Sequence, residues 1–221
     1  MQGRNGMTKA KKRIHGPEEH KPSSQDDPSL SQYLTHPITF LFGQAGTGKS
    51  HTAIKIALNQ FSLGKSQKTI ICRPQVECGG ERMGFLPGGP TDKCIPWLLP
   101  FRDVLTTILG DEKSADKVLQ TFEVVPLGLI RGRNFTDCVA ILDEAQNCNK
   151  DQFDAFLTRL GKNGRIIITG SHKQSDLPGK KQCLAKVADE LVIEGIASIH
   201  VLTKNYRGDR IDKIERAMSR V

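Results

Sequence analysis

Apolar residues in this chain gather in short runs that alternate with longer segments of helical spacing. The short runs predict buried strands at 37–42, 69–72, 122–125, 139–142, 165–169 and 198–202. The helical spacing predicts helices at 49–61, 95–109, 150–160, 181–191 and 209–218. Short apolar strands alternating with helices indicate a parallel sheet covered on both faces. We therefore predict an α/β fold.

The first 30 residues differ from the rest because they offer almost nothing apolar to bury. Lysines and arginines come first, followed by prolines, serines and acids. This composition predicts a flexible basic and polar arm over residues 1–30 and one domain over residues 31–221. The arm could contact nucleic acid or only keep the chain in solution, and its composition leaves both readings open.

A glycine-rich turn separates the first predicted strand from the first predicted helix. It fits the pattern G-x-x-x-x-G-K-[ST] at every fixed position, in the strand–turn–helix context that a phosphate-binding loop requires. Backbone N–H groups and the positive end of the helix dipole would hold phosphate oxygens. Lys49 would reach the β- and γ-phosphates, and the Ser50 hydroxyl would bind Mg²⁺. We expect ATP to contact Gly43, Gln44, Ala45, Gly46, Thr47, Gly48, Lys49, Ser50 and His51.

Two adjacent acids end the apolar run at 139–142. Asp143 would give Mg²⁺ its second protein support, through a water, and this explains why a carboxylate follows a buried strand here. Glu144 is one residue further on and points elsewhere, so it can act as general base for an attacking water. By themselves these acids would indicate only a solvated strand end. Beside a phosphate loop they favour ATP hydrolysis.

The composition of the chain also indicates where the protein is located and which class of partner it binds. The net charge is +8, from 32 basic and 24 acidic residues, which favours a polyanion such as nucleic acid. No apolar run approaches the roughly 20 residues that span a bilayer, and no apolar segment follows the start, so we expect a cytoplasmic protein without a membrane partner. The six cysteines show no C-x-x-C spacing, which argues against a zinc ribbon.

Four further stretches resemble the PhoH-like ATPases, and the acidic motif also resembles the second motif of superfamily-one helicases. They are Arg73-Pro74-Gln75-Val76-Glu77 with Met83–Gly88, Arg131-Gly132-Arg133-Asn134-Phe135, Leu142–Asn147, and Thr169–Pro178. The resemblance runs from about Gln32 to the end of the chain. It implies a RecA-like P-loop fold and ATP hydrolysis with RNA or DNA handling.

The resemblance also implies individual roles. Gln174 would contact the γ-phosphate region, and Gln32 would read adenine, although an ordinary polar residue is an equal reading of Gln32. One motif departs from the family, which usually has Thr-Gly-Asp where this chain has Thr169-Gly170-Ser171. Ser171 brings no charge to a metal or a lysine, which puts the rate of hydrolysis or its coupling in doubt.

The spread charge of a transferring phosphoryl group usually needs an arginine. The chain is too short for the second lobe that supplies one in helicases, so the arginine either comes from a neighbouring subunit or is missing. We expect the first of these, in a homohexameric ring. Arg131 and Arg133 are the first choices, ahead of Arg159 and Arg207. A surface role for these arginines remains equally open.

RNA or single-stranded DNA would bind where the second and fourth strands end. Arg73, Arg82 and Lys93 could meet phosphates there, with Phe85 and Trp97 available for stacking. Core packing is the stronger reading of Trp97. Two alternatives to a nucleic-acid-coupled ATPase stay open: a P-loop phosphotransferase, and a nucleotide-binding regulatory module with little hydrolysis.

Overall fold

A computed structural model of the chain describes residues 28–74, 95–171, 183–206, 208 and 217. The predicted helix at 209–218 and the predicted arm at 1–30 lie almost entirely outside these residues. Gln174, Arg207, Arg82, Lys93 and Phe85 lie outside them as well. No helix in the described part of the chain is long and apolar enough to cross a membrane.

Six strands of the described residues form one parallel sheet in the order β3-β2-β4-β5-β1-β6. Their bounds are β1 Ile38–Phe42, β2 Lys68–Arg73, β3 Phe122–Pro126, β4 Cys138–Leu142, β5 Arg165–Gly170 and β6 Ala197–Val201. β5 therefore lies between the strand that leads into the phosphate loop and the strand that ends at the two acids. This arrangement confirms the predicted α/β sheet of the phosphate-loop type.

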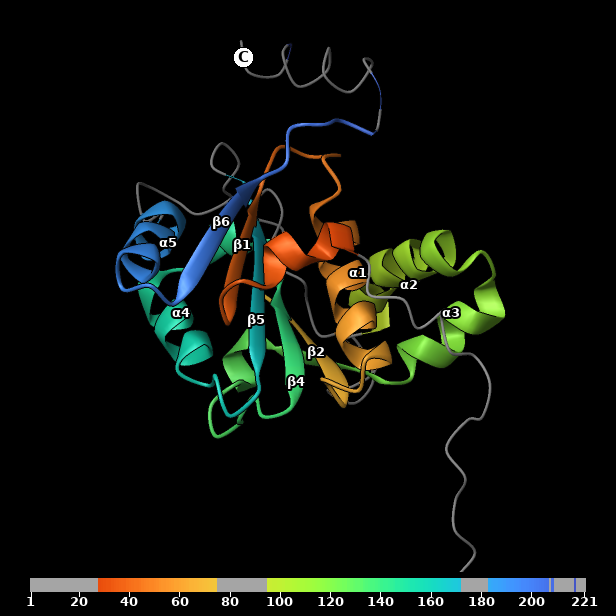
Figure 1. The fold of residues 1–221 in the computed structure, drawn as a ribbon, viewed down its shortest axis with the longest axis horizontal. Helices are drawn as coiled ribbons and strands as arrows, with labels where there is room; N and C mark the ends of the chain where they lie inside the picture. Colours follow the sequence, from red (N-terminus) through yellow and green to blue (C-terminus); the bar gives the residue numbers. More distant parts are fainter. Residues whose placement is uncertain (1–27, 75–94, 172–182, 207, 209–216, 218–221) are drawn as a thin grey trace, which may run out of the picture.

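Helices cover both faces of the sheet, as Figure 1 shows. The α-helices are α1 Lys49–Ser62, α2 Ile95–Leu109, α3 Glu112–Leu119, α4 Lys150–Leu157 and α5 Leu184–Ile193. Short 3-10 helices occur at η1 Pro28–Leu34, η4 Leu127–Leu129 and η5 Ala145–Asn147. α1, α2 and α3 lie on one side of the sheet, and α4 and α5 lie on the other (Figure 1).

Alternate residues of the strands feed two separate cores. Phe40 and Phe42 of β1 pack with Phe153 and Phe156 of α4. Leu41, the residue between them, belongs to the opposite core together with residues of α1 and α2. β1 and β4 are buried along their whole length. Burial on both faces explains why these strands read as continuous apolar runs rather than as alternating ones.

Three helices differ from the prediction, and of these α5 ends at Ile193 rather than at residue 191. α3 was missed because it has few apolar residues, although Asp111 caps it by accepting a hydrogen bond from the Ser114 N–H at 2.8 Å. α4 ends at Leu157 rather than at residue 160. Its start follows the sequence closely, because Asn149 and Gln152 form a reciprocal capping box.

Candidate nucleotide-binding site

The loop after β1 is held open by two left-handed glycines and by hydrogen bonds to its flanks. Gly46 and Gly48 have φ of 80° and 81°, a region that residues with a side chain rarely adopt. The Gly43 N–H donates to the Gly170 carbonyl of β5 at 3.3 Å. The Thr47 hydroxyl donates to the Gln44 carbonyl at 2.8 Å. These contacts fix the loop at the end of the sheet where the strands finish.

α1 begins directly after this loop and has no side-chain cap. Gly48 precedes its first residue and supplies no side-chain acceptor, so the first N–H groups of the helix point at the space above the loop. Lys49 Nζ donates to the carbonyls of Gly43 and Gln44, both at 2.9 Å. The lysine thus arches over the loop, which is where a charge for a β- or γ-phosphate is needed.

Ser50, at the start of α1, and Asp143, directly after β4, lie next to each other at the end of the sheet. The Ser50 hydroxyl donates to Asp143 Oδ1 at 3.2 Å, and the Thr169 hydroxyl of β5 donates to the same oxygen at 2.5 Å. Asp143 is only 6% exposed, and its N–H donates to the Cys72 carbonyl at 2.9 Å. The carboxylate is therefore fixed beside the serine. Sequence patterns gave no sign of the Thr169 contact, because it joins residues of neighbouring strands.

Glu144 faces a different environment from Asp143. Its backbone is left-handed, with φ of 55°, so the chain turns sharply between the two acids. Its side chain is 39% exposed and lies 3.5 Å from the Arg73 guanidinium. The second carboxylate oxygen accepts a hydrogen bond from Gln146 Nε2 at 2.5 Å. One acid is thus buried next to the phosphate loop, and the other is accessible to a water.

Gln146 links Glu144 to the end of β5. Its Oε1 accepts a hydrogen bond from the Ser171 N–H at 3.1 Å, and both residues are buried. Gly170 leaves room for this amide, because a Cβ there would lie 3.3 Å from Gln146 Oε1 and 2.6 Å from a Leu184 methyl. Residue 171 therefore contributes its backbone to the site, and the contact to Asp143 in this motif comes from Thr169.

The segment after β6 runs along the phosphate loop. The Leu202 N–H donates to the Phe42 carbonyl at 2.7 Å, and the Tyr206 N–H donates to the Gly46 carbonyl at 3.0 Å. The Tyr206 ring lies 3.5 Å from the position of a Cβ on Gly48, with the Lys204 ammonium 5.0 Å from its centre. No sequence motif pointed to Tyr206, and only its aromatic character in a polar segment could have drawn attention to it.

His51 and Gln32 are two further residues that the sequence predicts to contact the nucleotide. His51 is in the first turn of α1, and burial followed by the charge of Lys55 lowers its pKa. Gln32 lies in η1, is exposed, and donates from its amide to the Ser29 carbonyl at 3.0 Å. Their contacts with a nucleotide remain predictions.

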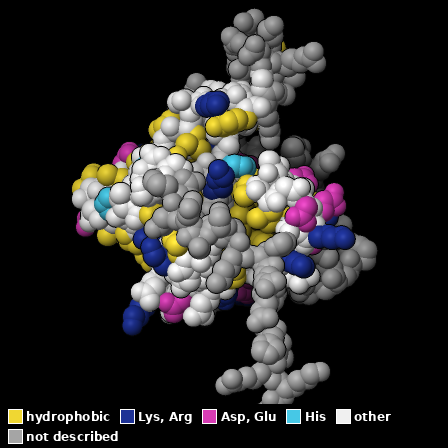
Figure 2. Space-filling model, turned by 45° about the vertical axis from the view of Figure 1, so that its right-hand side comes forward, with side chains coloured by type: hydrophobic (Ala, Val, Ile, Leu, Met, Phe, Trp, Pro, Cys, Tyr) yellow, Lys and Arg dark blue, Asp and Glu magenta, His cyan; other side chains and the backbone are white. Residues whose placement is uncertain are grey.

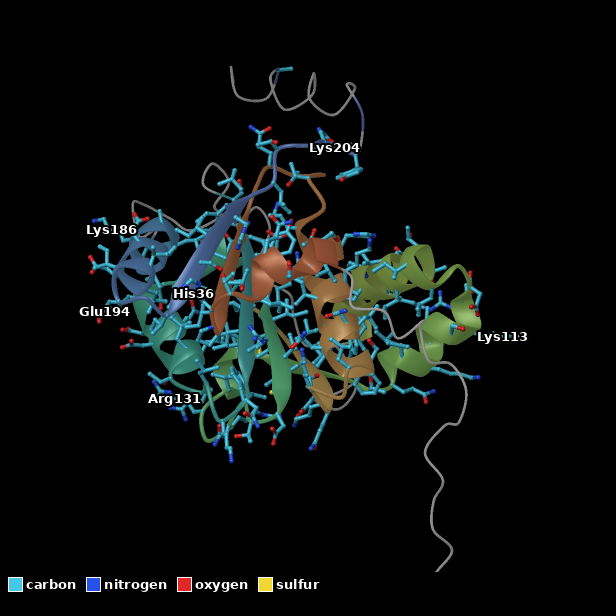
Figure 3. The ribbon with its side chains drawn as sticks, viewed as in Figure 1. His36, Lys113, Arg131, Lys186, Glu194 and Lys204 are labelled. Atoms are coloured by element: carbon cyan, nitrogen blue, oxygen red, sulfur yellow. The ribbon has the colours of Figure 1, made fainter. Side chains whose placement is uncertain are left out.

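Arg131 and Arg133 lie away from their own phosphate loop. Arg133 pairs with Glu123, which also accepts from Lys68 at 3.0 Å near the start of β2. Burial opposes ionisation of Glu123, but the hydrogen bonds from Arg133 and Lys68 hold its pKa below the usual range. Figure 3 shows Arg131 at the end of the molecule opposite Lys204. Neither arginine completes the site of its own chain.

Comparison with known proteins identifies the group to which this arrangement belongs. The family model described as PhoH-like protein matches residues 21–219. The chain belongs to the PhoH-like family. This is a family of P-loop NTPases whose members generally bind ATP, so the predicted resemblance is confirmed.

Curated relatives carry the same family name. A PhoH-like protein of Bacillus subtilis (strain 168) is 42% identical over 169 residues, which is 74% of this chain and 52% of the relative. A PhoH-like protein of Mycobacterium tuberculosis (strain ATCC 25618 / H37Rv) is 39% identical over 166 residues, 74% of this chain and 46% of the relative. Protein PhoH of Escherichia coli (strain K12) is 36% identical over 144 residues, 64% and 40% respectively. The chain spans about half the length of the curated relatives it matches.

The oxygen ligands of this PhoH-like site suit Mg²⁺. Ser50 and Asp143 offer a hydroxyl and a carboxylate at hydrogen-bonding distance from each other. No cluster of three or more His, Cys, Asp or Glu side chains forms a metal site in the described part of the chain. A pair of protein oxygens fits a cation that takes its other ligands from phosphates and water, as Mg²⁺ does in nucleotide sites.

Proposed function

We propose that this PhoH-like chain hydrolyses ATP with Mg²⁺ and couples hydrolysis to RNA or single-stranded DNA. The observation that carries the proposal is the convergence of Lys49, Ser50, Asp143 and Glu144 at one end of the sheet. A nucleotide-binding module needs the first three of these residues. The accessible Glu144 beside them is what hydrolysis adds, because an attacking water has to lose a proton.

Each of these residues has a separate role in the proposed reaction. Lys49 and the first N–H groups of α1 would hold the β- and γ-phosphates, while Ser50 and Asp143 would hold Mg²⁺. Bound Mg²⁺ would neutralise charge on the phosphate oxygens. Glu144 takes the proton of a water whose oxygen bonds to the γ-phosphorus. The bond from that phosphorus to the bridging oxygen breaks, and ADP and phosphate leave.

The proposal includes a ring of subunits, with a homohexamer as the expected form. Arg73 already lies 3.5 Å from Glu144, with which it forms an ion pair. Arg131 and Arg133 are too far from their own phosphate loop to neutralise the γ-phosphate there, so they would act across a subunit interface. Sedimentation should show an oligomer at working concentration. Monomers that hydrolyse ATP at the full rate would contradict the ring.

Support for nucleic acid comes from the net charge of +8 and from Arg73 at the end of β2. On the face shown in Figure 2, Lys and Arg side chains are dispersed among acids rather than merged into one basic surface. Nucleic acid would then bind through a small number of contacts between cations and phosphates. The affinity should decrease as the salt concentration rises, because each such contact releases counterions.

The deciding experiment measures phosphate release from ATP with and without single-stranded RNA or DNA. We expect Mg²⁺-dependent release that either nucleic acid increases. Release that neither changes would remove the coupling while leaving the ATPase intact. Binding of ATP without release would instead favour a regulatory nucleotide-binding module. Transfer of phosphate to an added acceptor in preference to water would favour a phosphotransferase.

A further inference from the structure

A cavity opens at the end of the sheet where β1, β4 and β5 begin. It has a volume of about 480 Å³, within the range of small-molecule sites. The phosphate loop follows the other end of β1, and a strand of five residues spans roughly 15 Å. The cavity is therefore separate from the nucleotide site. The polar side chains that line it include His36, Gln60, Lys65, Asp137, Asn163 and Arg165.

Cationic groups form one part of this lining. Arg165 donates from Nη1 to the carbonyls of Leu34 and His36, at 3.1 and 3.0 Å, which fixes its guanidinium in the wall. The Lys65 side chain is exposed and has no ion-pair partner among the described residues. His36 shares its Nδ1 with the Thr35 hydroxyl at 3.0 Å, which leaves Nε2 for another partner. These groups suit an anion.

An acid and an amide form another part. Asp137 accepts a hydrogen bond from Asn163 Nδ2 at 2.8 Å, through one carboxylate oxygen. Its backbone is tied on both sides, because its N–H donates to the Lys162 carbonyl at 3.0 Å and its carbonyl accepts from Gln67 at 2.7 Å. The other carboxylate oxygen is an acceptor for hydroxyl groups. A ligand of this cavity should thus combine an anion with hydroxyls.

We propose that this cavity binds a phosphorylated sugar, with the phosphate at Lys65 and Arg165 and sugar hydroxyls at Asp137. Arginine and lysine bind phosphate through charge-assisted hydrogen bonds, and a carboxylate accepts from vicinal hydroxyls. The same chemistry is present in a free sugar phosphate and in one nucleotide unit of an RNA strand. The site stands apart from ATP hydrolysis, because none of its residues belongs to the phosphate loop.

The test uses ribose 5-phosphate and a single-stranded RNA of about 12 nucleotides, added separately to the ¹⁵N-labelled protein. We expect saturable shifts of the amide signals of His36, Lys65 and Asn163 up to about 10 mM ribose 5-phosphate. The variant Lys65→Glu should weaken this binding about tenfold, the loss of one charge-assisted contact. Lys113→Glu is the matched control, since Figure 3 shows Lys113 on α3, remote from His36.

Each outcome decides the proposal. Shifts with ribose 5-phosphate alone identify a free sugar phosphate as the ligand, and shifts at the same residues with RNA identify a strand. Absence of saturable shifts with both probes overturns the site. Equal losses of affinity in Lys65→Glu and Lys113→Glu also overturn it, because they indicate an effect of net charge alone. Shifts centred on residues 43–50 overturn it as well, because they indicate binding at the phosphate loop. ATP turnover is not measured, so the outcome is independent of the proposed ATPase.

Discussion

The Ser50 hydroxyl lies 3.2 Å from Asp143 Oδ1, although 93 positions separate the two residues along the chain. Asp143 Oδ1 also accepts from Thr169, which is fully buried in β5. β5, which lies between β1 and β4, thus positions the Asp143 carboxylate through Thr169, and α1 places the Ser50 hydroxyl beside the same oxygen. The metal site proposed for these two oxygens would thus depend for its geometry on a buried threonine that is not itself one of the proposed ligands.

Replacing Thr169 by valine tests this dependence. Thr169→Val keeps the shape of the side chain but removes the hydrogen bond to Asp143, worth about 1 kcal/mol. The Mg²⁺ concentration for half-maximal ATP turnover should rise about fivefold, measured in a Mg²⁺ titration. Thr39→Val is the control, because this buried hydroxyl of β1 donates to the Tyr33 carbonyl instead. An equal rise in both variants would contradict a specific role for Thr169.

Removing the Lys49 amine should abolish tight ATP binding. Lys49→Ala loses the charge that arches over the phosphate loop, and two charge-assisted hydrogen bonds to phosphate correspond to about a 100-fold loss of affinity. Calorimetry with a non-hydrolysable ATP analogue measures it. Lys55→Ala, which removes an exposed lysine of the same helix, should bind as the unchanged protein does. Unchanged affinity in Lys49→Ala would place the nucleotide elsewhere.

Glu144→Gln should separate binding from hydrolysis. The amide cannot take a proton from water, so turnover should fall about 100-fold or more while the affinity for ATP stays nearly constant. Single-turnover phosphate release and analogue binding measure the two quantities. The control Glu190→Gln removes a carboxylate on the exposed surface of α5. Comparable turnover in Glu144→Gln would show that another group acts as base.

Gly164 has no room for a side chain. A Cβ there would lie 1.9 Å from the Phe135 carbonyl oxygen, which is backbone and cannot move away cheaply. Gly164→Ala should therefore lower the free energy of unfolding by about 3 kcal/mol, the upper range for overpacking. Gly128→Ala is the control, because nothing lies within 4 Å of its added methyl. Denaturant unfolding of both variants measures the difference.

Two buried thiols give the stability a dependence on alkaline pH. Burial raises the pKa of Cys138 to about 11 and that of Cys148 to about 12. In the unfolded chain both ionise near pH 8.5. Their contribution is complete below that pH and is lost as the pH rises towards the folded values. The free energy of unfolding should thus fall less between about pH 8.5 and 10 in a Cys138→Ala/Cys148→Ala variant than in the unchanged protein, measured by urea titrations.

The predictable features of this chain are those encoded by neighbours in sequence. The phosphate loop carries its own glycines, lysine and helix start, and β4 ends in its acids within a few positions. The contacts of Thr169, Arg73 and Gln146 join distant segments through strand order, which no local pattern contains. α3 was not predicted for a different reason. It buries few apolar residues, so its polar sequence resembled that of a loop.

The hydrogen bond from Tyr206 to the Gly46 carbonyl has a mechanical consequence. A peptide unit is planar, so the Gly46 carbonyl and the Thr47 N–H turn together. Any rotation that brings the Thr47 N–H to a phosphate also swings away the acceptor on which the Tyr206 backbone rests. The backbone of Tyr206 is therefore tied to the phosphate loop through this one peptide unit, so a rotation of the unit would break the hydrogen bond that holds the segment after β6 against the loop.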